Sequence, residues 1–133
     1  MAPEKIEIIY ARSPMVAQVF VHGESLKSVV VAIVVPDEIQ VRKWAKGIAD
    51  ADESAPMVDL VRNPALKKTI FDEMIALGKA ASLDSFEQVK DIYLEGEMWT
   101  AENELLTPTF KTKRPALIKK YRGVIDGMYE ELW

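Results

Sequence analysis

The chain has 133 residues, of which 49% are hydrophobic and 29% are charged, and its net charge is −4. This composition is ordinary for a soluble globular protein, and the length predicts a single domain over residues 1–133. The negative net charge gives no general reason to bind nucleic acid, so any anion site must be local. The lack of cysteine excludes disulfides and thiolate catalysis, and a single histidine, His22, argues against a structural zinc site or a Ser-His-Asp triad.

No stretch of the sequence is long and apolar enough to cross a membrane. The longest apolar run, residues 29–36, has eight residues, whereas a spanning helix needs about 20. The first residues contain no apolar signal core, and the last ones match no lipidation motif. We therefore expect neither a membrane span nor a nucleic-acid partner, and the compartment stays open.

The first third of the chain predicts a helix, a β-hairpin and a second helix. Pro3 suits the first turn of a helix, in which Ile6 and Ile9 share one face. Alternating apolar residues follow, and after a glycine-containing turn a continuous Val/Ile run predicts a strand buried on both faces. The expected elements are a helix over 3–11, strands over 15–21 and 28–35 around a turn at 22–25, and a helix over 38–46.

The middle of the chain predicts a loop, a long helix and a third strand. An acidic segment with Asp50, Asp52 and Glu53 lacks the glycine and closing glutamate of a calcium-binding EF-hand, so a solvated loop is favoured. Asn63 followed by Pro64 is a strong helix start. Regularly spaced apolar residues then predict the buried sides of this helix (Leu66, Ile70, Met74, Leu77, Ala81) and of a strand over 89–95 (Ile92, Leu94).

The last segment predicts an amphipathic helix that Pro115 opens. Because this helix is short, we favour packing of its apolar face in the core over binding to an anionic membrane. That face consists of Leu117, Tyr121, Val124, Ile125 and Met128. The whole chain therefore predicts an α+β fold, in which a small mixed sheet, made of a hairpin plus a further strand, is packed with helices.

The most informative stretch is residues 103–115, which read NELLTPTFKTKRP. It places Lys111, Lys113 and Arg114 after a proline-broken turn and before the helical tail. A lysine on such a turn can reach away from its own domain toward phosphate or carboxylate oxygens. Taken alone, the basic run is more typical of a solvated surface.

Five segments of the chain carry a family resemblance, and they are spread from residue 2 to residue 115, with no counterpart for the acidic loop around Asp50. They are residues 2–7 (APEKIE), 16–23 (VAQVFVHG), 31–37 (VAIVVPD), 85–90 (SFEQVK) and 105–115 (LLTPTFKTKRP). In this order they resemble the carboxyl-terminal domain of the acyl-adenylate-forming enzymes, specifically the long-chain fatty acyl-CoA synthetases. The resemblance implies the mobile lid domain of a long-chain fatty acid–CoA ligase.

The resemblance also implies the reaction of the complete enzyme. A large amino-terminal adenylation domain binds ATP and the fatty acid, and their reaction gives an acyl-adenylate and pyrophosphate while the lid is closed. The lid then rotates, and coenzyme A attacks the adenylate to give the thioester. The expected substrates and cofactors are therefore ATP, CoA and Mg, none of them bound to this chain alone. The location of the complete enzyme, whether cytoplasmic or peripheral on a membrane, stays open.

The resemblance places the adenylation lysine at Lys111. Most relatives have glycine before that lysine, whereas Phe110 stands there in this chain, as is common in the long-chain branch. Lys113 is therefore a rival, although Arg114 follows Lys111 by three residues as in the general motif. Glu104, Lys113 and Arg114 are expected to orient the turn or to contact phosphate, and no metal ligand is expected.

Two other interpretations stay open. In the first, the chain is the lid of an adenylating enzyme that passes its acyl group to a carrier protein or another acceptor. In the second, it is a non-catalytic module that docks a partner or anionic lipid through the basic surface from Lys111 to Arg122. Because the sequence contains no nucleotide-binding loop, we expect it to be a separated part of an enzyme and inactive alone.

Overall fold

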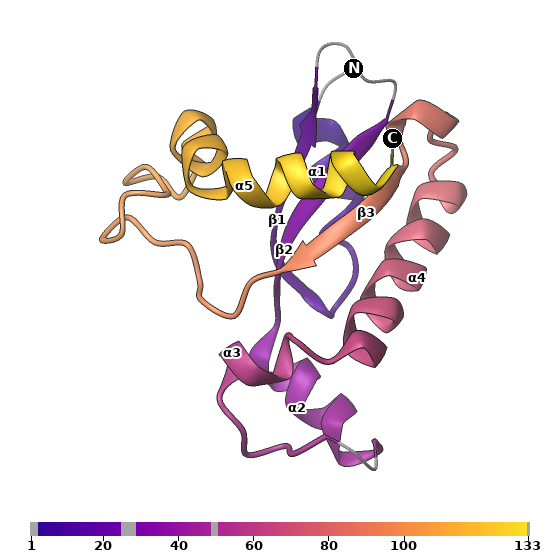
Figure 1. Ribbon diagram of the computed structural model, residues 1–133, viewed down its shortest axis with the longest axis vertical. Coiled ribbons are helices and arrows are strands. Elements are labelled where there is room, and N and C mark those ends of the chain that lie inside the picture. Colours follow the sequence, from indigo (N-terminus) through magenta and orange to yellow (C-terminus); the bar gives the residue numbers. More distant parts are fainter. Residues whose placement is uncertain (1–2, 25–28, 49–50, 133) are drawn as a thin grey trace. The chain divides into compact units, whose positions relative to one another are not determined.

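The computed structural model describes residues 3–24, 29–48 and 51–132. They belong to two compact units, which we call the sheet unit (Met1–Glu97) and the hairpin–helix unit (Met98–Trp133). The named strands all lie in the sheet unit, whereas the basic segment and the last helix lie in the hairpin–helix unit (Figure 1). No helix among the described residues is both long and apolar enough to cross a bilayer.

The sheet unit is built on a mixed sheet with the strand order β1-β2-β3. β1 (Val16–Gly23) pairs antiparallel with β2 (Val30–Pro36), and β3 (Val89–Leu94) pairs parallel with β2 (Figure 1). The central strand β2 is buried along its whole length, which agrees with its continuous Val/Ile run. The expected fold class, a small mixed sheet packed with helices, is confirmed.

The prediction of a turn over residues 22–25 places the start of the turn too early, because β1 continues to Gly23. His22 and Gly23 still belong to β1, where they pair with Val31 and Val30. Pairing with a buried neighbouring strand thus extends β1 through the glycine, which in the sequence looks like a turn signal. Three expected positions lie outside the described residues: Ser25, Ser28 and Asp50.

The two longer expected helices in the middle of the chain begin at the expected residues. Asp37 caps the first by accepting a hydrogen bond from Gln40 N at 3.0 Å, and Asn63 caps the second through Ala65 N at 2.9 Å. A short helix and a 3₁₀ turn are additions to the prediction. The helical elements of the sheet unit are α1 (Pro3–Tyr10), α2 (Glu38–Lys46), α3 (Met57–Leu60), α4 (Pro64–Ala80) and the 3₁₀ turn Ser85–Glu87.

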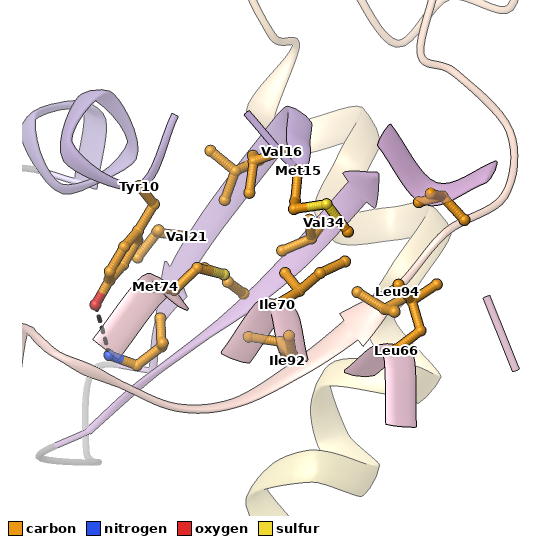
Figure 2. Packing of buried hydrophobic residues seen from close by; sticks show 14 of the residues in the cluster. Tyr10, Met15, Val16, Val21, Val34, Leu66, Ile70, Met74, Ile92 and Leu94 are labelled. Atoms are coloured by element: carbon orange, nitrogen blue, oxygen red, sulfur yellow. Dashed lines mark hydrogen bonds between the residues drawn. The ribbon is translucent and has the colours of Figure 1, made fainter. Parts of the chain in front are cut away.

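The core of the sheet unit lies between one face of the sheet and the helices α1 and α4. Figure 2 shows Ile70 and Met74 of α4 close to Val34 of β2 and Ile92 of β3. In the expected apolar stripe of α4 the first three residues are buried, whereas Leu77 and Ala81 are only half-buried. The stripe shifts to Gly78, because that small residue lets the ring of Tyr10 lie against the helix. The α4 prediction is therefore right in its first three turns and wrong in its last.

A buried hydroxyl connects α1 to β3. Tyr10 is fully buried, and its Oη accepts a hydrogen bond from Val89 N at 3.0 Å (Figure 2). Burial raises the pKa of the Tyr10 phenol above its ordinary value, since the ionised form would lose its hydration. The neutral hydroxyl therefore joins two segments that are 79 residues apart in the sequence.

The chain leaves β3 through a close contact with α3. A Cβ atom at Gly96 would lie 2.8 Å from Val58 Cα and 2.9 Å from Val58 N, far inside van der Waals contact. These are backbone atoms, so no side-chain rotation could relieve the overlap. Glycine is required at this position because the two backbones approach closely.

Candidate functional site

The basic segment of the hairpin–helix unit forms a tight β-hairpin, which we call the lysine hairpin (residues 105–113). Its arms are joined by the antiparallel Leu106–Thr112 bridge, by the hydrogen bond from Lys113 N to Leu105 O (2.9 Å) and by that from Thr107 N to Lys111 O (2.8 Å). A loop of three residues, 108–110, closes the hairpin. Lys111 therefore lies at the tip, and Lys113 lies at the base.

Thr107 holds both backbone groups of Lys111. Its N–H donates to Lys111 O, and its Oγ1 accepts a hydrogen bond from Lys111 N at 3.1 Å. The side chain of Lys111 is exposed, and within the residues that the structure describes no hydrogen bond or ion pair engages its Nζ. The hairpin thus fixes the lysine backbone and leaves the ammonium group available to an anion.

Phe110, at the third position of the loop, has a φ of 65°. This left-handed conformation costs a residue with a Cβ atom about 1–2 kcal/mol, and hairpin loops of this length favour glycine there. The glycine that the family pattern has at this position is thereby explained by the backbone. Phe110 adopts the same left-handed conformation although its Cβ atom makes that conformation unfavourable.

Two polar residues that the sequence analysis missed, Thr100 and Asn103, hold the chain that enters the hairpin. Thr100 N donates to Asn103 Oδ1 at 2.9 Å, and Asn103 N donates to Thr100 Oγ1 at 3.0 Å. Asn103 Nδ2 also donates to Met98 O at 3.1 Å, and Leu105 N and Leu106 N both approach Thr100 O at 3.1 Å. This reciprocal pair is a local turn motif, and its T-x-x-N spacing is the signal that could have predicted it.

An aromatic contact attaches the entering chain to the last helix, α5 (Arg114–Leu132). Trp99 is buried, and its Nε1 donates to Tyr121 Oη at 2.9 Å, with the rings in an edge-on arrangement at 6.2 Å. Four of the five residues of the expected α5 face are buried, whereas Val124 is only half-buried and Tyr129 is buried in addition. The segment that enters the lysine hairpin is therefore attached to α5, the helix that follows the hairpin.

The other predicted site residues lie at the base of the lysine hairpin. Lys113 is exposed, and its carbonyl accepts the first hydrogen bond of α5 from Leu117 N at 3.0 Å. Arg114 is the first residue of the helix and is half-buried. Glu104 is exposed with a φ of 66°, and it adjoins Leu105, which pairs with Lys113. The structure thus groups Glu104, Lys113 and Arg114 at one end and leaves Lys111 at the other.

The charges along α5 run against its dipole. Its first turn contains no acidic residue and begins with Arg114, whereas its last turn contains no basic residue and includes Glu130 and Glu131. Acidic residues at the start and basic residues at the end would each stabilise a helix by about 0.3–1 kcal/mol. The start of α5, together with the lysine hairpin, is therefore a local positive region in a chain whose net charge is −4.

The described residues offer no metal site. Among them, no three His, Cys, Asp or Glu side chains gather in a way that could hold an ion. Asp52 and Glu53 of the acidic loop are exposed, as expected for a solvated loop.

No family model matches the chain, but named proteins and solved structures do. It is 48% identical over 134 residues to long-chain-fatty-acid–CoA ligase 1 of Cavia porcellus and 47% identical over 131 residues to long-chain-fatty-acid–CoA ligase 6 of Homo sapiens. These alignments cover 99% and 97% of this chain, and the chain spans 18% of the length of either relative.

The fold resembles that of solved adenylation domains. The adenylation domain of the carboxylate reductase of Mycobacterium chelonae superposes with a TM-score of 0.80 at 31% identity, covering 98% of this chain and 18% of that one. The corresponding domain from Segniliparus rugosus, in complex with AMP and a co-purified carboxylic acid, gives a TM-score of 0.79 at 27% identity, covering 100% and 18%. By sequence and by fold, the chain is a homologue of the C-terminal part of the long-chain-fatty-acid–CoA ligases, in the superfamily of adenylate-forming enzymes.

Proposed function

We propose that the chain is the C-terminal lid of an AMP-forming long-chain fatty acid–CoA ligase and that Lys111 is its adenylation lysine. The observation that carries the proposal is the exposed ammonium group of Lys111 at the tip of a hairpin whose backbone is fixed by Thr107. The identity of 48% to a named ligase supports the reaction class. The tip position favours Lys111 over Lys113, because Lys113 lies at the base of the hairpin, directly before α5.

The first half-reaction explains why a cation is needed. An oxygen of the fatty acid carboxylate attacks the α-phosphorus of ATP, and the bond between that phosphorus and the bridging oxygen to pyrophosphate breaks. Negative charge moves onto the bridging oxygen and the pyrophosphate. An ammonium group in a closed, water-poor site stabilises this charge, and such donors contribute roughly 3 kcal/mol, or about 10²-fold in rate.

A lysine suits this task because it is a compact charge on a flexible stem. Its backbone can be fixed in the lid while its side chain adjusts to the phosphates. Arg114 and the start of α5 would add positive potential near the phosphates, and Lys113 and Glu104 would orient the base of the hairpin. The reversed charges of α5 support this assignment, because they act against the stability of the helix and are explained by a use for the positive end.

The second half-reaction uses the same lid in another orientation. After pyrophosphate leaves, the thiol of coenzyme A attacks the acyl carbon and AMP is released, which forms the thioester. The partner of the lid in both steps is the amino-terminal adenylation domain, which supplies the sites for ATP, magnesium and the fatty acid. Because one catalytic group is not an active site, we expect the 133-residue chain alone to catalyse neither step.

The test is fatty-acid-dependent ATP–pyrophosphate exchange by the complete enzyme, with thioester formation from preformed acyl-adenylate measured beside it. We expect Lys111→Ala to lower exchange by 10²-fold or more and to leave thioester formation within about threefold. Lys119→Ala, which removes an exposed lysine from α5, is the matched control and should leave both rates unchanged. If exchange persists in Lys111→Ala and disappears in Lys113→Ala, the assignment within the hairpin is wrong.

A second candidate function has a specific observation in its favour. Solved structures that match the fold include adenylation domains of carboxylate reductases, so the fold is compatible with an acyl acceptor other than coenzyme A. The sequence favours the ligase, because the identity is 48% to the ligase and 31% to the reductase domain. Formation of acyl-CoA from acyl-adenylate and free coenzyme A by the complete enzyme distinguishes the two. Full exchange without any acyl-CoA would support the second candidate.

A further inference from the structure

Phe110 combines two unfavourable features. Its backbone is left-handed, with a φ of 65°, and its side chain is 78% exposed to solvent. Among the described residues, the other non-glycine residues with positive φ are Ser82 and Glu104, which are polar and belong at a surface turn. A large apolar ring gains nothing from water, and a left-handed position disfavours its Cβ atom.

Neither feature is explained within the chain that the structure describes. Backbone sterics alone would favour glycine at this position, and contact with water alone would favour a polar residue. Strained residues of this kind gather at ligand contacts and switch regions, where the strain is part of the function. A contact with a surface outside the described residues would explain why an apolar ring is kept at this position.

The position of Phe110 restricts where that contact can be. Phe110 directly precedes Lys111, and the hydrogen bonds between Thr107 and Lys111 close the loop that carries both side chains. The ring and the ammonium group are thus presented from one rigid tip. Any surface that receives Lys111 must also accommodate the ring of Phe110.

We propose that Phe110 is a positioning residue, whose ring is buried against an apolar wall of the adenylation domain when the lid closes and thereby places Lys111 at the phosphates. The proposal rests on the function proposed above for Lys111. We assign the apolar wall to this domain because the chain spans only 18% of the length of its relatives. The rest of the complete enzyme must therefore supply the surface that the tip of the lysine hairpin enters. In the closed state the ring loses its contact with water, which stabilises closure and offsets the strain of the loop.

The decisive variant is Phe110→Gly in the complete enzyme. Glycine relieves the left-handed strain, so the melting temperature should stay the same or rise. We nevertheless expect kcat for ATP–pyrophosphate exchange to fall about tenfold, with KM for ATP and for the fatty acid within twofold and with thioester formation from preformed acyl-adenylate unchanged. Phe110→Leu keeps an apolar side chain and should retain exchange within about threefold.

A matched control and a parallel variant make the outcomes distinct. Ser82→Gly removes the same backbone strain from the sheet unit and should change neither half-reaction. If Phe110→Gly exchanges at the wild-type rate or faster, or if its main effect is on KM for the fatty acid, the positioning role is refuted. If Lys111→Ala in the same assay also exchanges normally, the function proposed for the lysine hairpin fails as well, so the two failures can be told apart.

Discussion

The hydrogen bond between Tyr10 and Val89 predicts a measurable loss of stability in Tyr10→Phe. The substitution keeps the ring and removes one oxygen, so the fully buried Val89 N–H loses its partner at 3.0 Å without a cavity of any size forming. Leaving a buried donor unsatisfied costs about 1–3 kcal/mol. With an m-value of about 2 kcal/mol/M for a protein of this size, a loss of about 2 kcal/mol lowers the urea midpoint by about 1 M.

The pH dependence of the same variant provides an internal check. The phenol has an ordinary pKa of 10.0, and burial raises the pKa in the folded chain. Above pH 10 the unfolded chain releases the Tyr10 proton while the folded chain retains it, so the folded state binds more protons and stability falls as pH rises. The contribution of the neutral Tyr10 hydroxyl to the unfolding free energy is thus fully present below pH 10, and it is lost as the pH rises through the pKa of Tyr10 in the folded chain. Tyr10→Phe lacks this contribution, so its deficit should be constant between pH 7 and 9 and should shrink above pH 10.

Equilibrium unfolding in urea of the 133-residue chain, wild type against Tyr10→Phe, measures both effects. A midpoint shift below about 0.2 M at pH 7 would show that Val89 finds another partner, and the reasoning from the buried donor would be wrong. A deficit that stays constant up to pH 11 would contradict the raised pKa.

Three further substitutions follow from other contacts. Gly96→Ala should lower the unfolding free energy by about 1–3 kcal/mol, because the new Cβ meets the backbone of Val58 at 2.8 Å and α3 must move; an unchanged urea midpoint would contradict this. Lys113→Ser places a helix-capping residue before α5 and removes a cation from its positive end, so unfolding should cost about 0.5–1 kcal/mol more, and a loss of stability in the same measurement would refute the capping argument. Trp99→Phe removes the buried hydrogen bond to Tyr121 at 2.9 Å and should lower stability by about 1–3 kcal/mol and pyrophosphate exchange by the complete enzyme severalfold; exchange at the wild-type rate would separate this contact from the lysine hairpin.

Much of the fold can be predicted from sequence because its signals are local and repeated. The continuous Val/Ile run predicts the buried β2, and Asn63 before Pro64 predicts the start of α4. The limits of this reasoning are equally physical. α3 spans four residues, too few for a periodic pattern, and the shift of the α4 stripe to Gly78 depends on the ring of Tyr10, which comes from a distant segment.

The residues of the lysine hairpin can be named from the sequence, whereas the geometry of the hairpin cannot, and the catalytic role of Lys111 stays a prediction. The order of Pro108, Lys111 and Lys113 indicates a turn with cations, and the family resemblance selects among them. Nothing in the sequence shows that Phe110 adopts a left-handed backbone, because phenylalanine disfavours it and only the closed hairpin imposes it. Nor does the sequence show that the hairpin separates Lys111 from Lys113, since this follows from the pairing of the two arms.

The reversed charges of α5 would make the stability of this helix depend on a bound anion. Without an anion, the basic start and the acidic end of the helix both interact unfavourably with its dipole, and a phosphate group bound at the basic start would offset the first of these interactions. A ligand that binds only the folded state adds about 2.7 kcal/mol to the unfolding free energy at a hundredfold excess over its Kd. If the function proposed above holds, we expect the complete enzyme to resist proteolysis better with ATP bound than without it.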